Sequence, residues 1–182
     1  HLLNPLFYIN QNLCYKLLFD AASQALQKAG RNPQFLGAET GAVAVLHTWG
    51  QTLTYHPHIH MLVPAGGLSE DGMEWIQSGK KFFVPVKALS AIFRGILIRR
   101  IKEQWDKNIF RLPDGFPDFS MLKKMLYEKK WNVYSKKALS GINSVLVYLA
   151  RYTHRMAISN SRISHVENGK VTFRYKNYQK RG

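Results

Sequence analysis

The chain has 182 residues, of which 26 are Lys or Arg and 11 are Asp or Glu, so its formal net charge is +15. Because 46% of the residues are apolar, the chain can bury a core, which excludes a disordered basic tail. No apolar run approaches the ~18 residues of a membrane span, and the single cysteine, Cys14, excludes a disulfide framework or a cysteine-rich zinc module within this stretch. This length predicts one compact domain.

The basic character of the chain, with a pI near 10.0, is typical of proteins that bind nucleic acid, although excess charge also serves solubility alone. Lys and Arg are grouped on a predicted helix over 87–105, over 123–137 and in the C-terminal third. Aromatic residues stand among the last two groups, as suits contact with unpaired bases. The distribution therefore favours a nucleic-acid partner.

The N-terminal third predicts a helix followed by two strands. Apolar residues recur at helical spacing over 10–29. The run 41–49 is short, apolar and bounded by glycines, which predicts a buried strand. A second apolar run, 58–63, follows after the short connection 50–55, so the two strands are expected to be antiparallel neighbours.

The middle of the chain predicts short strands and a long helix. Gly66-Gly67 and the turn Glu70-Asp71-Gly72 lead into strand-like pieces at 73–76 and 82–86. A helix over 87–105 follows, with an apolar stripe along one face.

The C-terminal part predicts further helices and a hairpin. Asn168-Gly169 is the strongest two-residue hairpin signal. Strands and helices mix without strict alternation, which predicts an α+β fold with a central antiparallel sheet flanked by helices. The elements expected here are a loop at 106–117, a basic helix at 118–130, a strand at 131–134, a helix at 142–153 and strands at 163–167 and 171–175.

Two histidines occupy alternate positions of the predicted strand that begins near Tyr55. His58 and His60 are two residues apart, so both side chains leave the same face, with Cα atoms ~6.6 Å apart. Two imidazoles can converge on one metal ion over that separation. Ile59 points to the other face, toward a core. The pattern predicts a metal site on the floor of a cleft; the alternative is two ordinary histidines.

A third metal ligand is expected from the neighbouring strand. His56 would lie ~13 Å from His60, too far to share one ion with it. His47 is the candidate: it lies opposite His58 or His60 if the numbers of facing residues sum to an odd value, and otherwise it is a packed core histidine. Two or three nitrogen ligands leave open positions, as at divalent-ion sites that also bind substrate oxygen.

The predicted helix 142–153 carries two tyrosines one turn apart. Tyr152 lies ~40° around the helix from Tyr148 and ~6 Å further along its axis. Arg151 and, if the helix extends that far, Arg155 fall on the same face. The tyrosines are either half-buried packing residues or functional phenols. A phenol with a pKa of ~10 becomes a useful nucleophile where cations or a metal stabilise its phenolate.

Together these segments resemble the HUH endonuclease superfamily, named for its His–hydrophobe–His strand, and within it the two-tyrosine rolling-circle transposases of bacterial insertion sequences. The resemblance also extends to the N-terminal string NPLFYINQ and the long helix. It rests on the strings LHTWGQTLTYHPHIHMLVPAGGLS (46–69), VYLARYTHRMAISNSRI (147–163) and GKVTFRYKNY (169–178).

The resemblance implies an enzyme that nicks and rejoins single-stranded DNA at transposon ends and targets. It implies that His58 and His60 hold a divalent ion, Mg²⁺ or Mn²⁺, and that Tyr148 and Tyr152 are nucleophiles. One phenolate would attack the scissile phosphate, leaving a 5′-phosphotyrosine and a free 3′-OH, without ATP because the phosphodiester is exchanged. The residues expected to contact DNA are Arg151, Arg155, Arg162, Arg174 and Lys176.

The resemblance also bears on the extent and location of the protein. Members of the family carry an N-terminal cysteine-rich zinc-binding region that this sequence does not contain, so residues 1–182 are expected to be a single catalytic domain from a longer protein. Nothing in the sequence resembles a signal peptide. We therefore expect a bacterial cytoplasmic protein associated with the nucleoid.

Two other functions fit parts of the sequence. A non-catalytic single-stranded nucleic-acid-binding module, derived from such an enzyme, would use the basic and aromatic residues and keep the tyrosines for packing. An unrelated metal hydrolase or oxygenase would use His58 and His60 with a carboxylate ligand, for which Glu39 and Glu70 are the acidic residues near in sequence.

Overall fold

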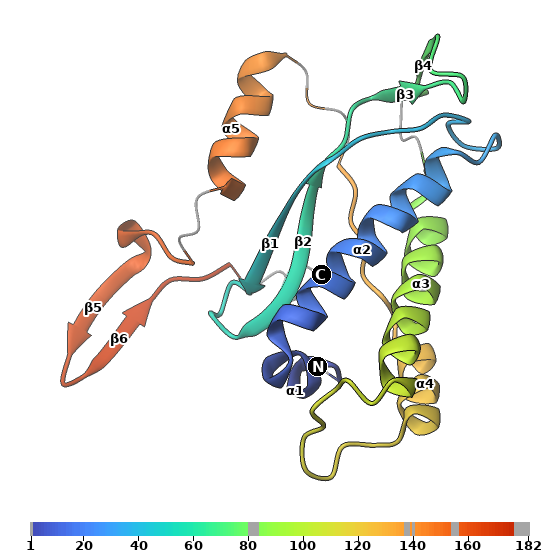
Figure 1. Cartoon of the computed structure of the whole chain (residues 1–182). Coiled ribbons are helices and arrows are strands. Elements are labelled where there is room, and N and C mark those ends of the chain that lie inside the picture. Colours follow the sequence, from blue (N-terminus) through green and yellow to red (C-terminus); the bar gives the residue numbers. More distant parts are fainter. Residues whose placement is uncertain (1, 80–83, 137–138, 140, 154–156, 177–182) are drawn as a thin grey trace.

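The computed structural model of the chain describes residues 2–79, 84–136, 139, 141–153 and 157–176. Helices and antiparallel strand pairs give it the α+β class that the sequence predicts (Figure 1). In chain order the elements are α1 (Asn4–Ile9), α2 (Gln11–Gly30), β1 (Val43–Trp49), β2 (Tyr55–Leu62), β3 (Gly66–Leu68), β4 (Trp75–Gln77), α3 (Val86–Asp106), α4 (Phe119–Glu128), α5 (Ile142–Thr153), a 3-10 turn (Asn160–Arg162), β5 (Ile163–Glu167) and β6 (Lys170–Phe173).

The strands of the described residues form three separate two-stranded antiparallel sheets rather than one larger central sheet. The pairs are β1–β2, β3–β4 and β5–β6. Of these, the β1–β2 hairpin carries the predicted histidines, and it lies next to α2, with α3 on the other side of that helix (Figure 1).

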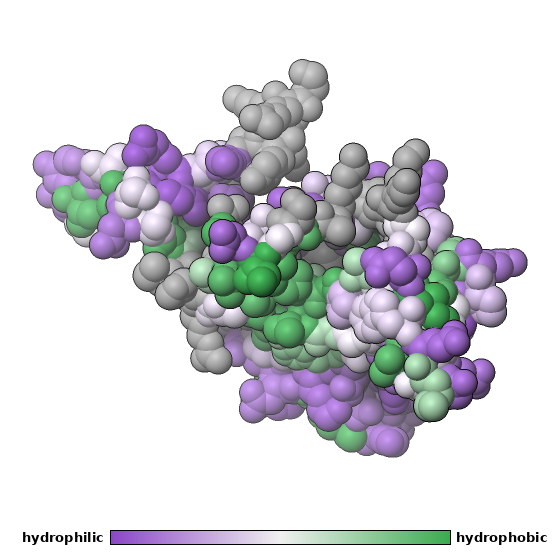
Figure 2. Space-filling model, turned by 90° about the horizontal axis from the view of Figure 1, so that it is seen from above, coloured by the Kyte–Doolittle hydropathy of each residue, from purple (hydrophilic) through white to green (hydrophobic). Residues whose placement is uncertain are grey.

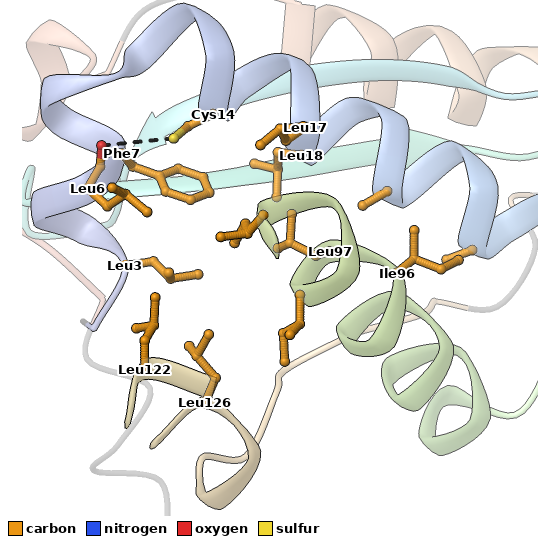
Figure 3. Close-up of a cluster of buried hydrophobic side chains, with 14 residues drawn as sticks. Leu3, Leu6, Phe7, Cys14, Leu17, Leu18, Ile96, Leu97, Leu122 and Leu126 are labelled. Carbon is orange, nitrogen blue, oxygen red and sulfur yellow. Dashed lines mark hydrogen bonds between the residues drawn. The ribbon is translucent and has the colours of Figure 1, made fainter. Parts of the chain in front are cut away.

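The hydrophobic core lies between α1, α2, α3 and α4 (Figure 3). Leu6, Leu97, Ile101 and Leu122 are almost completely buried in it. Each such side chain contributes about 1.5–3 kcal/mol relative to an exposed position. The apolar face of α2 completes the core, because its apolar residues recur at helical spacing: these are Cys14, Leu17, Leu18, Ala21 and Ala25.

The core also determines which face of the β1–β2 hairpin is covered. Leu46 of β1 and Ile59 of β2 pack against the core cluster. Side chains alternate between the two faces of a strand, so His47, His58 and His60 point the other way. The histidines therefore lie on the face that the core helices do not cover.

The pairing of β1 with β2 contains one irregularity, at Pro57. His47 faces His58, while the next facing pair is Trp49 and Tyr55. One residue on β1 therefore stands opposite two on β2, His56 and Pro57, which is the arrangement of a β-bulge. Proline has no N–H to give to a strand ladder, and a bulge is one of the few strand positions that tolerate it.

Two glycines form most of β3, a short strand that the sequence does not predict. A Cβ on Gly66 would lie 2.5 Å from the carbonyl oxygen of Ile76, and one on Gly67 would collide with the carbonyl oxygen of Glu39. The backbones approach too closely for any side chain, so these positions of the strand require glycine. The predicted turn at Glu70-Asp71-Gly72 is confirmed by the hydrogen bond from the N–H of Gly72 to the carbonyl oxygen of Ser69, at 2.9 Å.

The predicted helices at 10–29, 87–105, 118–130 and 142–153 are confirmed by α2, α3, α4 and α5. At the start of α4 the carboxylate of Asp118 accepts a hydrogen bond from the backbone N–H of Met121, at 2.8 Å, which caps the helix. The short helix α1, which has a proline in its first turn, was not predicted.

The strand predicted at 131–134 is wrong, because this segment lies in neither a strand nor a helix. The Nε1–H of Trp131 donates to the carbonyl oxygen of Leu126 at 2.9 Å, and its ring meets Phe93 edge-on with centroids 5.8 Å apart. Trp131 thus packs on α3 and α4. Of the strand predicted at 82–86, residues 82–83 lie outside the described part and Val86 begins α3.

The predicted C-terminal hairpin is confirmed by β5 and β6. Asn168 and Gly169 have φ angles of 50° and 71°, the left-handed values that a two-residue hairpin turn requires. The hairpin extends away from the rest of the molecule (Figure 1). In the view from above, the projecting hairpin is mostly hydrophilic, and the centre of the molecule shows an exposed hydrophobic area (Figure 2). Among the described residues, no helix combines the length and hydropathy of a transmembrane segment.

Candidate metal centre and tyrosine helix

Three histidines from the β1–β2 hairpin converge on one point. His47 faces His58 directly, and Val45 faces His60, so the facing numbers sum to an odd value. His47 thus shares a face with the other two imidazoles, as the sequence predicted for that register. One ring nitrogen from each of the three lies within 4.8 Å of the other two, and all three side chains are half-buried. The predicted site therefore exists as a cluster that can hold a metal ion.

The orientation of His58 follows from a backbone contact. Its Nδ1 lies 2.7 Å from the carbonyl oxygen of His56, which makes Nδ1–H the donor and leaves the lone pair on Nε2. This Nε2 points at the Nε2 of His60, 3.1 Å away. A backbone carbonyl that fixes the tautomer of a histidine in this way is common around metal-ligating imidazoles.

The spacing of these nitrogen atoms fits a bound cation. Two neighbouring ligands at ~2.1 Å from an ion in octahedral geometry are about 3.0 Å apart. The separation of 3.1 Å between the two Nε2 atoms matches that value. The donor set consists of imidazoles, which suit transition metals better than Mg²⁺, an ion that prefers oxygen ligands. The residues present thus fit a divalent ion that keeps open positions for oxygen ligands.

Burial favours the neutral form of two of these imidazoles, His58 and His60. Burial lowers the pKa of His60 to about 4, with smaller contributions from His58 and His47. Burial also lowers the pKa of His58, against the opposing effect of the contact with the His56 carbonyl. Neutral imidazoles are the form that binds metals, so protons compete little for this site at neutral pH.

An aromatic ring supports the third ligand. Trp49 stacks on His47 with ring centroids 5.0 Å apart and an angle of 13° between the planes. His56 lies outside the cluster of three: it is exposed, and its ring centroid is 5.2 Å from that of His58. This agrees with the expectation that His56 cannot share the ion with His60.

The start of β2 is held by contacts that the sequence analysis missed. The hydroxyl groups of Tyr55 and Tyr15 are 3.0 Å apart, and the ring of Tyr8 meets Tyr55 edge-on at 5.4 Å. The Nδ2–H of Asn4 donates to the carbonyl oxygen of Tyr55 at 2.8 Å. Burial, together with the Tyr15 contact, raises the pKa of Tyr55. These contacts fix the histidine strand on α1 and α2. No periodicity in the sequence predicts them.

The helix α5 carries the two predicted tyrosines, Tyr148 and Tyr152, one turn apart along its backbone. The side chain of Tyr148 is half-buried. Three apolar side chains of the same helix are exposed: Ile142, Leu146 and Val147. The side chains of Tyr152 and Arg151 are not among those described, and Arg155 lies outside the described residues. The roles of these residues stay predictions.

Two of the residues expected to contact DNA have structural partners. The guanidinium of Arg162 donates to the carbonyl oxygens of Arg174 and Gln51, at 2.7 and 2.8 Å, and lies over the ring of Phe173. Arg162 therefore joins the β5–β6 hairpin to the connection between β1 and β2. Arg174 donates to the carbonyl oxygen of Ser161 at 2.8 Å, while Lys176 is exposed. Their contact with DNA stays a prediction.

Comparison with known proteins adds a family. A family model described as "Putative transposase" matches residues 41–182. This range contains the three clustered histidines and both tyrosines of α5. "Putative transposase y4qJ" of Sinorhizobium fredii (strain NBRC 101917 / NGR234) is 41% identical over 181 residues, which cover 94% of this chain and 45% of the relative. "Transposase for insertion sequence element IS801" of Pseudomonas savastanoi pv. phaseolicola is 30% identical over 186 residues, which cover 94% of this chain and 40% of that relative. The chain thus spans less than half the length of these relatives. No solved structure matches it.

Proposed function

The chain belongs to the family of transposases whose model it matches, and from this premise we propose that it is the part of a transposase that nicks and rejoins single-stranded DNA at the ends of an insertion element. The relative from Pseudomonas savastanoi is named as the transposase of an insertion sequence, which supports DNA of such an element as the substrate. For a DNA substrate we also propose a bacterial cytoplasmic location at the nucleoid.

The observation that carries the proposal is the cluster of His47, His58 and His60, whose ring nitrogens lie within 4.8 Å of one another. These residues would hold the divalent ion, Mn²⁺ or Mg²⁺; the imidazole ligands favour Mn²⁺ of the two. When bound, such an ion polarises a phosphate and stabilises the charge that develops on its oxygens. The role of the histidines is to hold the ion and to leave coordination positions open toward the substrate.

The tyrosines of α5 are proposed to supply the nucleophile. A phenol oxygen, after loss of its proton to solvent, forms a bond to the scissile phosphorus, and the bond from phosphorus to the 3′ oxygen breaks. The 3′ oxygen takes up a proton, so the products are a 5′-phosphotyrosine and a free 3′-OH. Tyr148 and Tyr152 are one helical turn apart, so a second phenol is available while the first holds DNA.

The experiment that tests the proposal measures the covalent adduct. The chain is incubated with Mn²⁺ and a labelled single-stranded oligonucleotide that carries an end of the element, and the products are separated under denaturing conditions. We expect a labelled protein band that resists boiling in detergent. The band should disappear when Tyr148 and Tyr152 are both replaced by Phe, because no phenol oxygen then remains on α5 to form the bond.

Matched substitutions make the test specific. Tyr134→Phe removes a phenol that is 81% exposed and lies outside α5, so the adduct should persist. His165→Ala removes an imidazole on the β5–β6 hairpin and should also leave the adduct unchanged, whereas His60→Ala should abolish it. A covalent band in the Tyr148→Phe, Tyr152→Phe double variant would exclude these residues as nucleophiles. Binding without any adduct, across metals and DNA ends, would favour the non-catalytic binding module instead.

A further inference from the structure

A cleft of about 930 Å³ lies between the second half of α2 and the middle of α3. Its walls carry three basic side chains: Lys28 near the end of α2, Arg31 just after that helix, and Arg99 on α3. Its apolar lining includes Ile92 and Gly95. No carboxylate is among the described residues that line it. Volumes of ~300–1,000 Å³ are typical of clefts that take small ligands, so this one has room for a few nucleotides.

The positive charges of the cleft are available to a ligand. Arg31 pairs with Glu39 at 3.0 Å and Arg99 with Glu103 at 3.8 Å, with every one of these side chains at least 40% exposed. Exposed pairs of this kind contribute little to stability, so a phosphate can replace the carboxylate at low cost. Lys28 makes no ion pair with any residue of the described part.

A glycine in the middle of α3 points to close contact with something outside the chain. Glycine is the least favourable residue in a helix interior after proline, and a Cβ on Gly95 would meet no described atom within 4 Å other than those of its chain neighbours and the backbone of its own helix. By contrast, a Cβ on Gly30, at the end of α2, would lie 3.1 Å from the carbonyl oxygen of Ala38. Packing within the chain accounts for Gly30 and not for Gly95, whereas a ligand that touches the backbone of α3 would require the missing side chain.

We propose that the α2–α3 cleft is a second nucleic-acid site, which holds a few nucleotides of single-stranded DNA on the helical side of the molecule, away from the histidine cluster. Its basic side chains meet the phosphates, and the bases or sugars lie on the apolar lining beside Gly95. The choice of DNA as the ligand rests on the proposed function. The location follows from the core, because α2 lies against the hairpin face opposite to that of the histidines, and α3 lies on the far side of α2.

Site-specific cross-linking tests the location. Cys14 is completely buried, and burial raises its pKa to about 12, so a maleimide benzophenone labels only an introduced cysteine. The full chain carrying Ala91→Cys, an exposed position of α3 on the wall of the cleft, is labelled and irradiated in EDTA with a fluorescent single-stranded oligonucleotide. The control is Ser120→Cys, exposed on α4 beside Lys123 and Lys124, which offers positive charge without the cleft. We expect a several-fold higher cross-linking yield at position 91, and more with single strands than with duplex. Equal yields at the two positions, or a preference for duplex, would overturn the proposal.

The salt dependence of binding tests the chemistry. Each phosphate contact with a single strand contributes about 0.7 to the slope of log K against log salt, so replacing Lys28, Arg31 and Arg99 together by Ala should lower the slope by about 2. The charge-matched control replaces Lys123, Lys124 and Lys129 on and just after α4 by Ala. Circular dichroism checks that both variants fold. Fluorescence anisotropy should show a much larger loss of affinity for the cleft variant, and equal slopes in the two variants would contradict the assignment.

These measurements separate the two proposals, because neither the cross-linking nor the salt dependence requires metal or cleavage. Cross-linking at position 91 in a chain that forms no covalent adduct would contradict the proposed nicking activity and leave the cleft as a binding site. Adduct formation without cross-linking at position 91 would overturn the cleft alone.

Discussion

His47 of β1 lies directly opposite His58 of β2, with ring centroids 5.6 Å apart and ring planes nearly perpendicular, at 89°. This pairing brings an imidazole from β1 to the two on β2, which lie 11 and 13 positions later in the sequence, so that the three side chains surround one point. The regular ladder that runs from this pair to Val43 and Leu62 fixes the backbone positions of all three histidines before any ion binds.

Loss of one imidazole should weaken metal binding strongly. For His60→Ala we expect the dissociation constant for Mn²⁺, measured by titration calorimetry, to rise by at least about tenfold, because the remaining ligands leave the ion fewer bonds. His165→Ala is the matched control, since that imidazole pairs with Glu167 on the β5–β6 hairpin at 2.8 Å. Equal affinities for the two variants would contradict the assignment of the site.

The metal-free protein should lose stability as the pH falls from about 6.5 toward 4. In the unfolded chain the imidazole of His60 takes up a proton near pH 6.5, whereas in the folded protein its pKa is lowered to about 4. Between these values the unfolded state binds more protons, so the free energy of unfolding decreases as the pH decreases. Above pH 7 both states are neutral and this effect vanishes.

Urea unfolding in EDTA at a series of pH values measures this dependence, and His60→Gln provides the comparison. The glutamine does not titrate, so its stability curve should be flatter between pH 6.5 and 4 than that of the parent chain. A curve of the same steepness would show that the pKa of His60 does not differ between the folded and unfolded states.

The core prediction concerns Leu97 of α3, which is 1% exposed. Leu97→Ala leaves a cavity between the helices and should lower the free energy of unfolding by about 2–5 kcal/mol. Leu146→Ala, on α5, changes a side chain that is 56% exposed and should cost less than about 1 kcal/mol. Chemical denaturation of both variants checks the difference; similar losses would place Leu97 outside the packed core.

Arg162 is predicted to hold the β5–β6 hairpin in position. Its guanidinium donates to the carbonyl oxygens of Arg174 and Gln51, so Arg162→Ala should release the hairpin from the β1–β2 connection. Hydrogen exchange over residues 163–173 should become faster, while exchange in α2 stays unchanged. Arg162→Lys keeps the charge but cannot span both carbonyls, so it should show most of the same acceleration; slow exchange in both variants would rule out this role.

The sequence predicts the local elements well where the signal is periodic or depends on turn chemistry. The apolar spacing of α2 and α3 and the turn at Asn168-Gly169 define their elements within a few residues. The placement of His58 and His60 on one face also follows from strand geometry alone. These features depend only on neighbours in the chain.

Features that depend on distant partners were missed or left open. Whether His47 faces His58 depends on the register of the hairpin. The sequence shows that the numbers of facing residues must sum to an odd value, but it does not show whether they do. The strand at Gly66 and Gly67 was not predicted, because glycine is required there by the backbones of Ile76 and Glu39, which are distant in the chain. The α2–α3 cleft requires two helices that are distant in the chain to lie side by side, which helical periodicity does not determine.

The two-residue spacing of the imidazoles on β2 limits which insertions the hairpin can accept. One extra residue within the exposed connection 51–54 lengthens the loop and leaves every side chain of both strands on its own face. One extra residue between His58 and His60 would instead send these imidazoles to opposite faces, with one of them turned into the core of leucines and isoleucines. Length variation among natural versions of this hairpin should therefore be confined to its tip.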